Sequence, residues 1–261
     1  MGESSSTKVV ITLVGGPTAL IEVGGVTLLT DPTFDEPQAY QGAAVTLVKS
    51  TGPSLRPEQL PAIDAVLLSH DQHFDNLDHG GRAFLPQVPR VLTTQVGAGR
   101  LGGNAEGLAT WDSTLVRSNT NGTLTVTAVP ARHGPAGIEP LAGDVAGFVV
   151  TPEGAGGSIY ISGDTVWYDG VAAISQRFDI KLAVLFTGAA RPRGAFHMTM
   201  GSNDAIDFAH AFPTATIVAV HNEGWMHFTE SQAELARSFA TVGIGDRLRH
   251  LERGAPLTLE Y

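Results

Sequence analysis

Six side chains that are able to bind a metal ion follow short apolar segments of this sequence. They are His70, His73, Asp75, His133, Asp164 and His221. Short apolar segments predict buried strands, and a strand end holds its side chain in a fixed place, so that side chains from four strand ends can meet around one ion. Taken singly, some have a structural alternative: Asp75 also fits the cap of a helix that begins near Asn76, and His133 fits a solvated loop.

The residue types indicate which metals and which reaction to expect. Imidazole and carboxylate ligands suit Zn²⁺, Mn²⁺ or Fe²⁺, and the chain has no cysteine to offer as a thiolate ligand. A carboxylate shared between two ions about 3.5–4 Å apart is typical of two-metal hydrolases, and Asp164 is the candidate for that role. In such a site the metal lowers the pKa of bound water toward neutrality. Asp75 is a candidate metal ligand and also a candidate general base for that water.

Residues near the end of the chain are candidates for holding the substrate. Arg191 and Arg193 stand in the Pro- and Gly-rich segment AARPRG. Paired guanidinium groups suit a carboxylate or phosphate, although a solvated basic loop has the same appearance. His197, in FHMTM, is a candidate catalytic residue if it reaches the cleft; alternatively it only precedes a helix. The segment following His221 adds Trp225 and His227.

Trp225 and His227 are candidate walls of a substrate pocket because an aromatic group beside a metal site often lines the cavity. Trp225 is equally compatible with an ordinary position in the core. Asp31, in LLTDPTF, is expected to tie a turn before Pro32 by accepting hydrogen bonds from nearby backbone amides.

The composition favours a small-molecule substrate, and the arginine pair described above suits an anionic one. The chain has 261 residues, 43% of them hydrophobic, and a formal charge of −10 with only 16 Lys and Arg. This charge disfavours nucleic acid as a partner, and no apolar segment reaches the roughly 18 residues of a membrane span. The N-terminal MGESSSTKVV lacks a signal peptide's apolar segment, so a cytoplasmic protein with one domain over residues 1–261 is expected.

The order of predicted elements favours two sheets between layers of helices. Strands are predicted at Val9–Val14, Ala19–Val23, Val26–Thr30, Ala65–Leu68, Val91–Thr94, Leu124–Val129, Val145–Thr151, Ser158–Ile161, Leu182–Phe186 and Thr216–Val220. Helices are predicted at Ser202–Phe212 and Glu230–Thr241, the second with Thr229 as its N-cap. Meandering strands followed by alternating strands and helices fit such a sandwich better than a doubly wound sheet.

These residues together resemble the metallo-β-lactamase superfamily, whose motif H-x-H-x-D-H is followed by a lone His, a bridging Asp and a final His. The segment GGPTALIEVGGVTLLTDPTF resembles the branch that contains ascorbate-6-phosphate lactonase and N-acylphosphatidylethanolamine phospholipase D. TGAARPRGAFHMTMGSNDAI and VAVHNEGWMHF also match, so the resemblance covers nearly the whole chain. It implies a four-layer αββα sandwich of the α+β class and a metal-dependent hydrolase.

The core motif of this chain, SHDQHFDN, departs from the family pattern in two ways. One extra residue separates the two histidines, so either His70 or Asp71 takes the first ligand position, and we favour His70 because Ser69 marks the end of the strand. Asn76 stands where the family has its last motif histidine.

The resemblance implies how the ligands divide between two metal positions. His70, His73 and His133 would hold the first ion, Asp75 and His221 would hold the second, and Asp164 would be shared. An amide oxygen is a poor ligand for zinc, so Asn76 predicts one tightly bound ion, most simply Zn²⁺, and a weakened second site. The substrate expected is a small ester, lactone, amide or phosphodiester. The altered motif also keeps open a member of the fold that acts as a binding protein or a non-hydrolytic biosynthetic enzyme.

Overall fold

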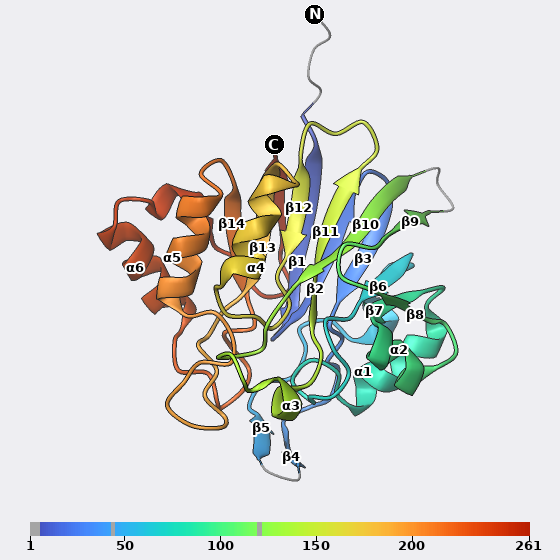
Figure 1. Ribbon diagram of the computed structural model, residues 1–261. Coiled ribbons are helices and arrows are strands. Elements are labelled where there is room, and N and C mark those ends of the chain that lie inside the picture. The colour runs from blue at the N-terminus through green and yellow to red at the C-terminus, as the bar shows by residue number, and fades with distance from the viewer. Residues whose placement is uncertain (1–5, 43–44, 119–121) are drawn as a thin grey trace, which may run out of the picture.

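Two seven-stranded sheets pack face to face in the computed structural model, which describes residues 6–42, 45–118 and 122–261 (Figure 1). The first sheet contains, in spatial order, β16 (Pro256–Glu260), β1 (Lys8–Gly15), β2 (Thr18–Val23), β3 (Val26–Thr30), β6 (Ala65–Leu67), β7 (Val91–Thr94) and β8 (Ala105–Leu108). The second contains β15 (Leu248–Arg249), β14 (Thr216–Val220), β13 (Ile180–Phe186), β12 (Ser158–Ile161), β11 (Ala146–Pro152), β10 (Thr123–Pro130) and β9 (Ser113–Arg117). A separate hairpin is formed by β4 (Gln38–Gln41) and β5 (Thr46–Lys49).

Six short α-helices in the described part of the chain surround the two sheets. They are α1 (His79–Phe84), α2 (Gln95–Leu101), α3 (Glu139–Ala142), α4 (Asp169–Ala172), α5 (Ser202–Ala211) and α6 (Gln232–Thr241), with short 3₁₀ helices at Pro57–Gln59, Leu85–Gln87, Ala173–Gln176 and Gly245–Arg247. Figure 1 shows α4, α5 and α6 against the second sheet and α1 and α2 beside the first. The predicted αββα arrangement is therefore confirmed. Among the described residues, no helix is both long and apolar enough to cross a membrane.

Three layers of apolar side chains explain this arrangement. The central layer joins the facing sides of the sheets, with Ile21 of β2 and Phe148 of β11 among its fully buried members. A second layer packs Phe208 of α5 against the outer face of the second sheet, and a third packs Phe84 of α1 against the first. Because both faces of the inner strands are buried, these strands appear in the sequence as continuous apolar runs, which is why they were predictable.

Both sheets are mixed, and their parallel strands carry the loops that matter for function. β3, β6, β7 and β8 run parallel to one another, as do β12, β13, β14 and β15. The carboxyl ends of parallel strands lie at one edge of a sheet, where ligands commonly bind. The β4–β5 hairpin and α3 lie at one end of the sandwich (Figure 1).

The helical predictions were correct in place but not in every detail. The last helix begins one residue after Ser231, whose hydroxyl accepts a hydrogen bond from the Glu234 amide, so the predicted Thr229 cap is wrong. The short helix α1 was not predicted because its sequence, HGGRAF, contains two glycines and no helical repeat of apolar residues. Its N-cap is Asp78, which accepts a hydrogen bond from Gly81, and not Asp75.

Candidate metal centre

Three imidazoles converge at the ends of β6 and β10. His73 Nδ1 lies 2.9 Å from His70 Nε2 and 3.1 Å from His133 Nε2. Zinc bound at about 2.0–2.1 Å separates its nitrogen ligands by roughly 2.9–3.4 Å, depending on the coordination geometry. Both distances from His73 Nδ1 therefore fit ligands of one ion, and the three ligand atoms all lie within 4.8 Å of one another.

Two of these histidines have their other ring nitrogen fixed by a neighbour. His133 Nδ1 lies 2.7 Å from the carbonyl oxygen of Met198, to which it donates. His70 Nδ1 lies 2.9 Å from the hydroxyl of Ser69. With a proton on each Nδ1, both Nε2 atoms keep a lone pair for a metal.

Burial keeps the candidate histidine ligands neutral. Burial lowers the pKa of His133 to about 3 and that of His221 to about 4, and it holds the pKa of His70 well below its usual value. A neutral imidazole is the form that binds a metal, so these side chains are ready to coordinate at neutral pH.

A second group joins the loops after β6, β12 and β14. Asp164 Oδ1 lies 3.3 Å from His221 Nδ1, and Asp75 Oδ2 lies 3.6 Å from His221 Nε2. The other Asp164 oxygen, Oδ2, lies 3.6 Å from His133 Nε2 in the first group. Asp164 thus directs one oxygen to each group, which is the geometry of a carboxylate shared between two ions.

The pKa values of the two carboxyl groups in this second group are shifted in opposite directions. Burial raises the pKa of Asp164 well above its usual value, and the charges of Asp75 and Asp31 add to this effect. Burial also opposes ionisation of Asp75, but the hydrogen bond and charge of His227 and the charge of His221 hold its pKa below the usual range. No Lys or Arg among the described residues forms an ion pair with Asp31, Asp75 or Asp164.

Buried polar atoms without partners show that a cation fits here. Within the described part of the chain, they include both carboxylate oxygens of Asp164, Oδ1 of Asp75 and both ring nitrogens of His221. Leaving such atoms unpaired costs about 1–3 kcal/mol each, and more for charged groups. A divalent ion would satisfy the carboxylate oxygens and one nitrogen of His221, so the donor set fits a metal.

The backbone is forced into unusual conformations to place these groups. His221 follows β14 directly and has a φ of 56°, a backbone conformation that residues other than glycine rarely adopt. Gly163, at φ +58°, precedes Asp164, and a Cβ there would come within 2.7 Å of Ser69 Cβ. Such strain costs about 1–3 kcal/mol per residue and is concentrated at functional sites.

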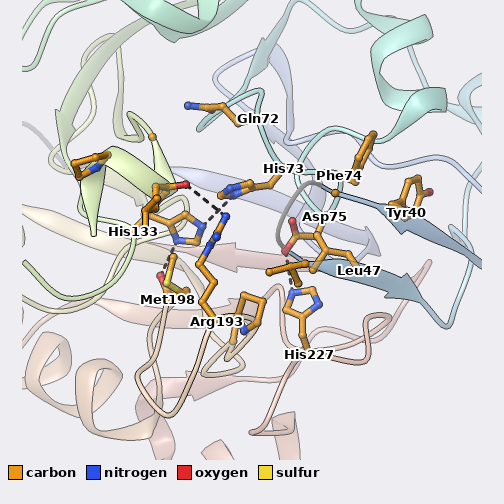
Figure 2. Close-up of a pocket in the computed structure, with 18 of the residues that line it drawn as sticks. Tyr40, Leu47, Gln72, His73, Phe74, Asp75, His133, Arg193, Met198 and His227 are labelled. Atoms are coloured by element: carbon orange, nitrogen blue, oxygen red, sulfur yellow. Dashed lines mark hydrogen bonds and ion pairs between the residues drawn. The ribbon is translucent and has the colours of Figure 1, made fainter. Parts of the chain in front are cut away.

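A cavity of about 440 Å³ opens over the two groups (Figure 2). Its walls are mostly apolar, with contributions from Tyr40, Val45, Leu47, Phe74, Pro140, Leu141, Ala142, Ala190 and Met198. Polar groups reach it from Gln72, His73, Asp75, Arg100, His133, Arg193 and His227. The cavity is thus a mostly apolar pocket, and three of the six candidate metal ligands, His73, Asp75 and His133, line it.

Comparison with known proteins decides the family. Residues 27–222 match the Beta-lactamase superfamily domain. The chain belongs to the metallo-β-lactamase superfamily. The UPF0173 protein YddR of Bacillus subtilis is 24% identical over 257 residues, which are 95% of this chain and 99% of that protein. A UPF0173 metal-dependent hydrolase of Myxococcus xanthus is 29% identical over 213 residues, covering 76% of this chain and 64% of that protein.

Solved structures agree with this assignment. An isothiocyanate hydrolase from Delia radicum gut bacteria has a TM-score of 0.82 at 28% identity, over 95% of this chain and 98% of that chain. A possible metal-dependent hydrolase from Veillonella parvula has a TM-score of 0.80 at 21% identity, over 98% and 100% of the two chains, which shows the shared fold. The predicted enzyme class, a metal-dependent hydrolase of the metallo-β-lactamase superfamily, is confirmed by these relatives.

In this metallo-β-lactamase superfamily member, the structure places His70, and not Asp71, beside the other two histidines. His70 lies with His73 and His133, whereas the Asp71 carboxylate faces Arg100, whose Nε is 2.9 Å from Oδ2. The extra residue between the histidines is accommodated by turning Asp71 and Gln72 away from the histidine group.

The structure brings some of the predicted substrate residues to the cavity and not others. Arg193 and His227 line it, and His227 Nε2 lies 2.9 Å from Asp75 Oδ2. Arg191 instead contacts His197, and His197 faces a different, shallow depression beside Trp167. Trp225 is 4% exposed and does not line the cavity; its ring packs against Tyr40.

Sequence reasoning missed several residues that shape this site. Tyr40 and Phe74 stack with ring centroids 4.7 Å apart and form one wall of the cavity. The β4–β5 hairpin that carries Tyr40 and Leu47 is too short to show a clear alternating pattern. Phe74 stands between the candidate ligands His73 and Asp75, and this position is the feature of the sequence that could have placed it at the site.

Proposed function

We propose that this protein hydrolyses a small, neutral, largely apolar electrophile of the isothiocyanate class with the aid of bound metal. The observation that carries the proposal is the apolar cavity directly above the candidate metal ligands. A solved isothiocyanate hydrolase that resembles this chain over nearly its full length adds support. A phosphodiester is less favoured, because Arg100 is paired with Asp71. Among the described residues that line the cavity, this leaves Arg193 as the one arginine without an acidic partner.

The ligand assignment follows from the two groups of side chains. His70, His73 and His133 would hold a first ion, for which Zn²⁺ is the best candidate, and Asp164 would reach a second ion held by Asp75 and His221. Asn76 offers no imidazole to the second position, so we expect weaker retention there. When bound, the metal supplies a water molecule of lowered pKa and a Lewis acid.

The residues around the cavity have distinct tasks in such a reaction. The apolar walls, including Phe74 and Leu47, would hold the organic group and exclude bulk water. Figure 2 shows the Arg193 side chain extending toward His73 and His133, where its guanidinium can donate to an atom that gains negative charge. Asp75 is the candidate for accepting a proton if the second position is empty.

For an isothiocyanate the chemistry balances with water alone. The water oxygen bonds to the central carbon of R–N=C=S, while one water proton passes to nitrogen and the other to sulfur, which gives the thiocarbamic acid R–NH–C(=O)–SH. This acid then breaks its C–N bond as the S–H proton passes to nitrogen, and it releases carbonyl sulfide and the amine R–NH₂. The oxidation states do not change, so no redox cofactor is required.

A substrate panel tests the proposal. Zinc-loaded protein is assayed with an aryl isothiocyanate, a lactone, an aryl ester, an aryl amide and an aryl phosphodiester, and amine release is measured for the first. We expect the isothiocyanate to be turned over with the highest kcat/KM. Turnover of the phosphodiester or lactone without turnover of the isothiocyanate would contradict the substrate assignment, and a metal-free protein that binds but does not convert these compounds would favour a binding role.

The two arginines of AARPRG provide an internal comparison. Arg193→Ala is expected to lower kcat/KM by about 10²-fold, because it removes a donor to charge that develops in the reaction. Arg191→Ala should leave kcat/KM unchanged, since Arg191 contacts His197 outside the cavity. Steady-state kinetics of both variants check this, and equal losses in the two would contradict the assigned role of Arg193.

A further inference from the structure

We propose that Asp31 is a positioning residue that acts on the first metal position through Ser69. Asp31 lies at the turn after β3, is 1% exposed, and has a φ of 29°. The inference rests on the proposed metal-dependent function and identifies a residue that holds His70 in its binding orientation.

The hydrogen bonds form a continuous chain from Asp31 to His70. The Ser69 hydroxyl donates to Asp31 Oδ1 at 2.6 Å, and the Ser69 amide donates to the same oxygen at 2.9 Å. Because the single hydroxyl proton of Ser69 is given to Asp31, its oxygen must accept from His70 Nδ1, which lies 2.9 Å away. His70 Nε2 is then the nitrogen left to face His73 and a metal.

The same carboxylate also contacts the altered position of the motif. Asn76 is fully buried, and its Nδ2 lies 3.5 Å from Asp31 Oδ1. The amide N–H₂ group of Asn76 is placed to donate to Asp31. We therefore interpret Asn76 as part of the support for Asp31.

The placement of Asp31 is difficult to explain by local structure alone. The turn is already held by backbone and side-chain bonds that do not use the carboxylate: the Asp31 amide donates to Leu67, and Thr18 donates to the Asp31 carbonyl. A buried carboxylate without an ion-paired Lys or Arg is costly, and nearby metal ions would compensate its charge. Hydrogen-bonded carboxylates behind metal-binding histidines commonly orient the ring and increase its basicity.

The experiment measures zinc affinity in the full-length protein by competition with a chromophoric chelator. We expect Asp31→Ala and Ser69→Ala each to weaken zinc binding at the tighter position by about 10–100-fold. Asp31→Asn keeps an acceptor for Ser69 but loses the charge, so it should lower the zinc affinity less than Asp31→Ala does. The double variant Asp31→Asn/Ser69→Ala should lose no more than the worse of its single variants, since both act through one chain.

Two controls separate positioning from folding. Ser54→Ala removes a hydroxyl that bonds to backbone carbonyls of β1, and Asp64→Asn alters a carboxylate that accepts from the Thr27 amide; neither contacts a candidate ligand. Both should bind zinc as the wild type does. The visible spectrum of the Co²⁺-substituted protein gives a second readout, which should change in the Asp31 and Ser69 variants and stay constant in the controls.

Wild-type zinc affinity in both Asp31→Ala and Ser69→Ala would overturn this inference while leaving the proposed function intact. Full additivity in the double variant would also overturn it, because independent effects exclude a shared chain. If Asp31→Ala fails to fold, Ser69→Ala alone decides, since it removes a single hydroxyl. A wild-type protein that binds no zinc would overturn the proposed function itself.

Discussion

His133→Ala is expected to abolish retention of the tightly bound metal, and His70→Ala is expected to do the same. Each variant removes a ring nitrogen that lies about 3 Å from His73 Nδ1, a distance that fits two ligands of one zinc ion. Loss of a direct ligand should weaken metal binding by more than the roughly 10–100-fold caused by loss of a residue that only orients a ligand. Hydrolytic activity should fall with the metal content.

Elemental analysis of the purified variants checks this prediction. His250→Ala is the matched control, since His250 is exposed and belongs to neither candidate group. Circular dichroism of the metal-free proteins shows whether the variants fold. Full metal retention in both the His70 and His133 variants would show that His70, His73 and His133 do not hold the tightly bound metal.

Metal removal is expected to lower the thermal midpoint by roughly 10 °C. An ion present at about 1,000 times its Kd contributes about 4 kcal/mol, and each kcal/mol shifts the midpoint of a protein of this size by about 2–4 °C. The structural reason is that Asp164 has two buried oxygens without partners, with Asp75 and Asp31 nearby. Without a cation these groups must be protonated or remain unpaired.

Differential scanning calorimetry with and without a chelator measures this shift, and added zinc should reverse it. In Asp164→Asn the shift should be smaller, because the variant has one buried carboxylate fewer and binds metal more weakly. Identical midpoints before and after complete removal of the metal would show that the buried acids do not depend on a cation.

Much of the fold could be predicted from the sequence because its inner strands are buried on both faces. Runs such as Ala65–Leu67 and Thr216–Val220 are almost entirely apolar, so their existence was predictable; the second has the predicted bounds, and the first ends one residue before the predicted Leu68. The hairpin of β4 and β5 could not be predicted, since its strands have four residues each and little burial on one face. Thr229 and Ser231 are both good caps in isolation, and the choice between them depends on the register of the following helix.

The positions of candidate ligands that follow strands could be predicted from the sequence. The orientation of side chains that lie within a loop could not. His133, Asp164 and His221 each stand within three residues of a strand end, so the sheets fix their positions. Arg191 and Arg193 are two residues apart in a loop, and nothing in the sequence distinguishes which of them enters the cavity. The sequence indicated only a turn role for Asp31, because its contact with Ser69 joins residues 38 positions apart.

The most direct test of the central claim is a crystal structure of the protein as purified, with diffraction data collected on both sides of the zinc absorption edge. We expect an anomalous peak bound by His70 Nε2, His73 Nδ1 and His133 Nε2, and a second peak of equal or lower occupancy between Asp75, Asp164 and His221. No peak among the three histidines, in protein that still hydrolyses its substrate, would show that this group is not the metal centre.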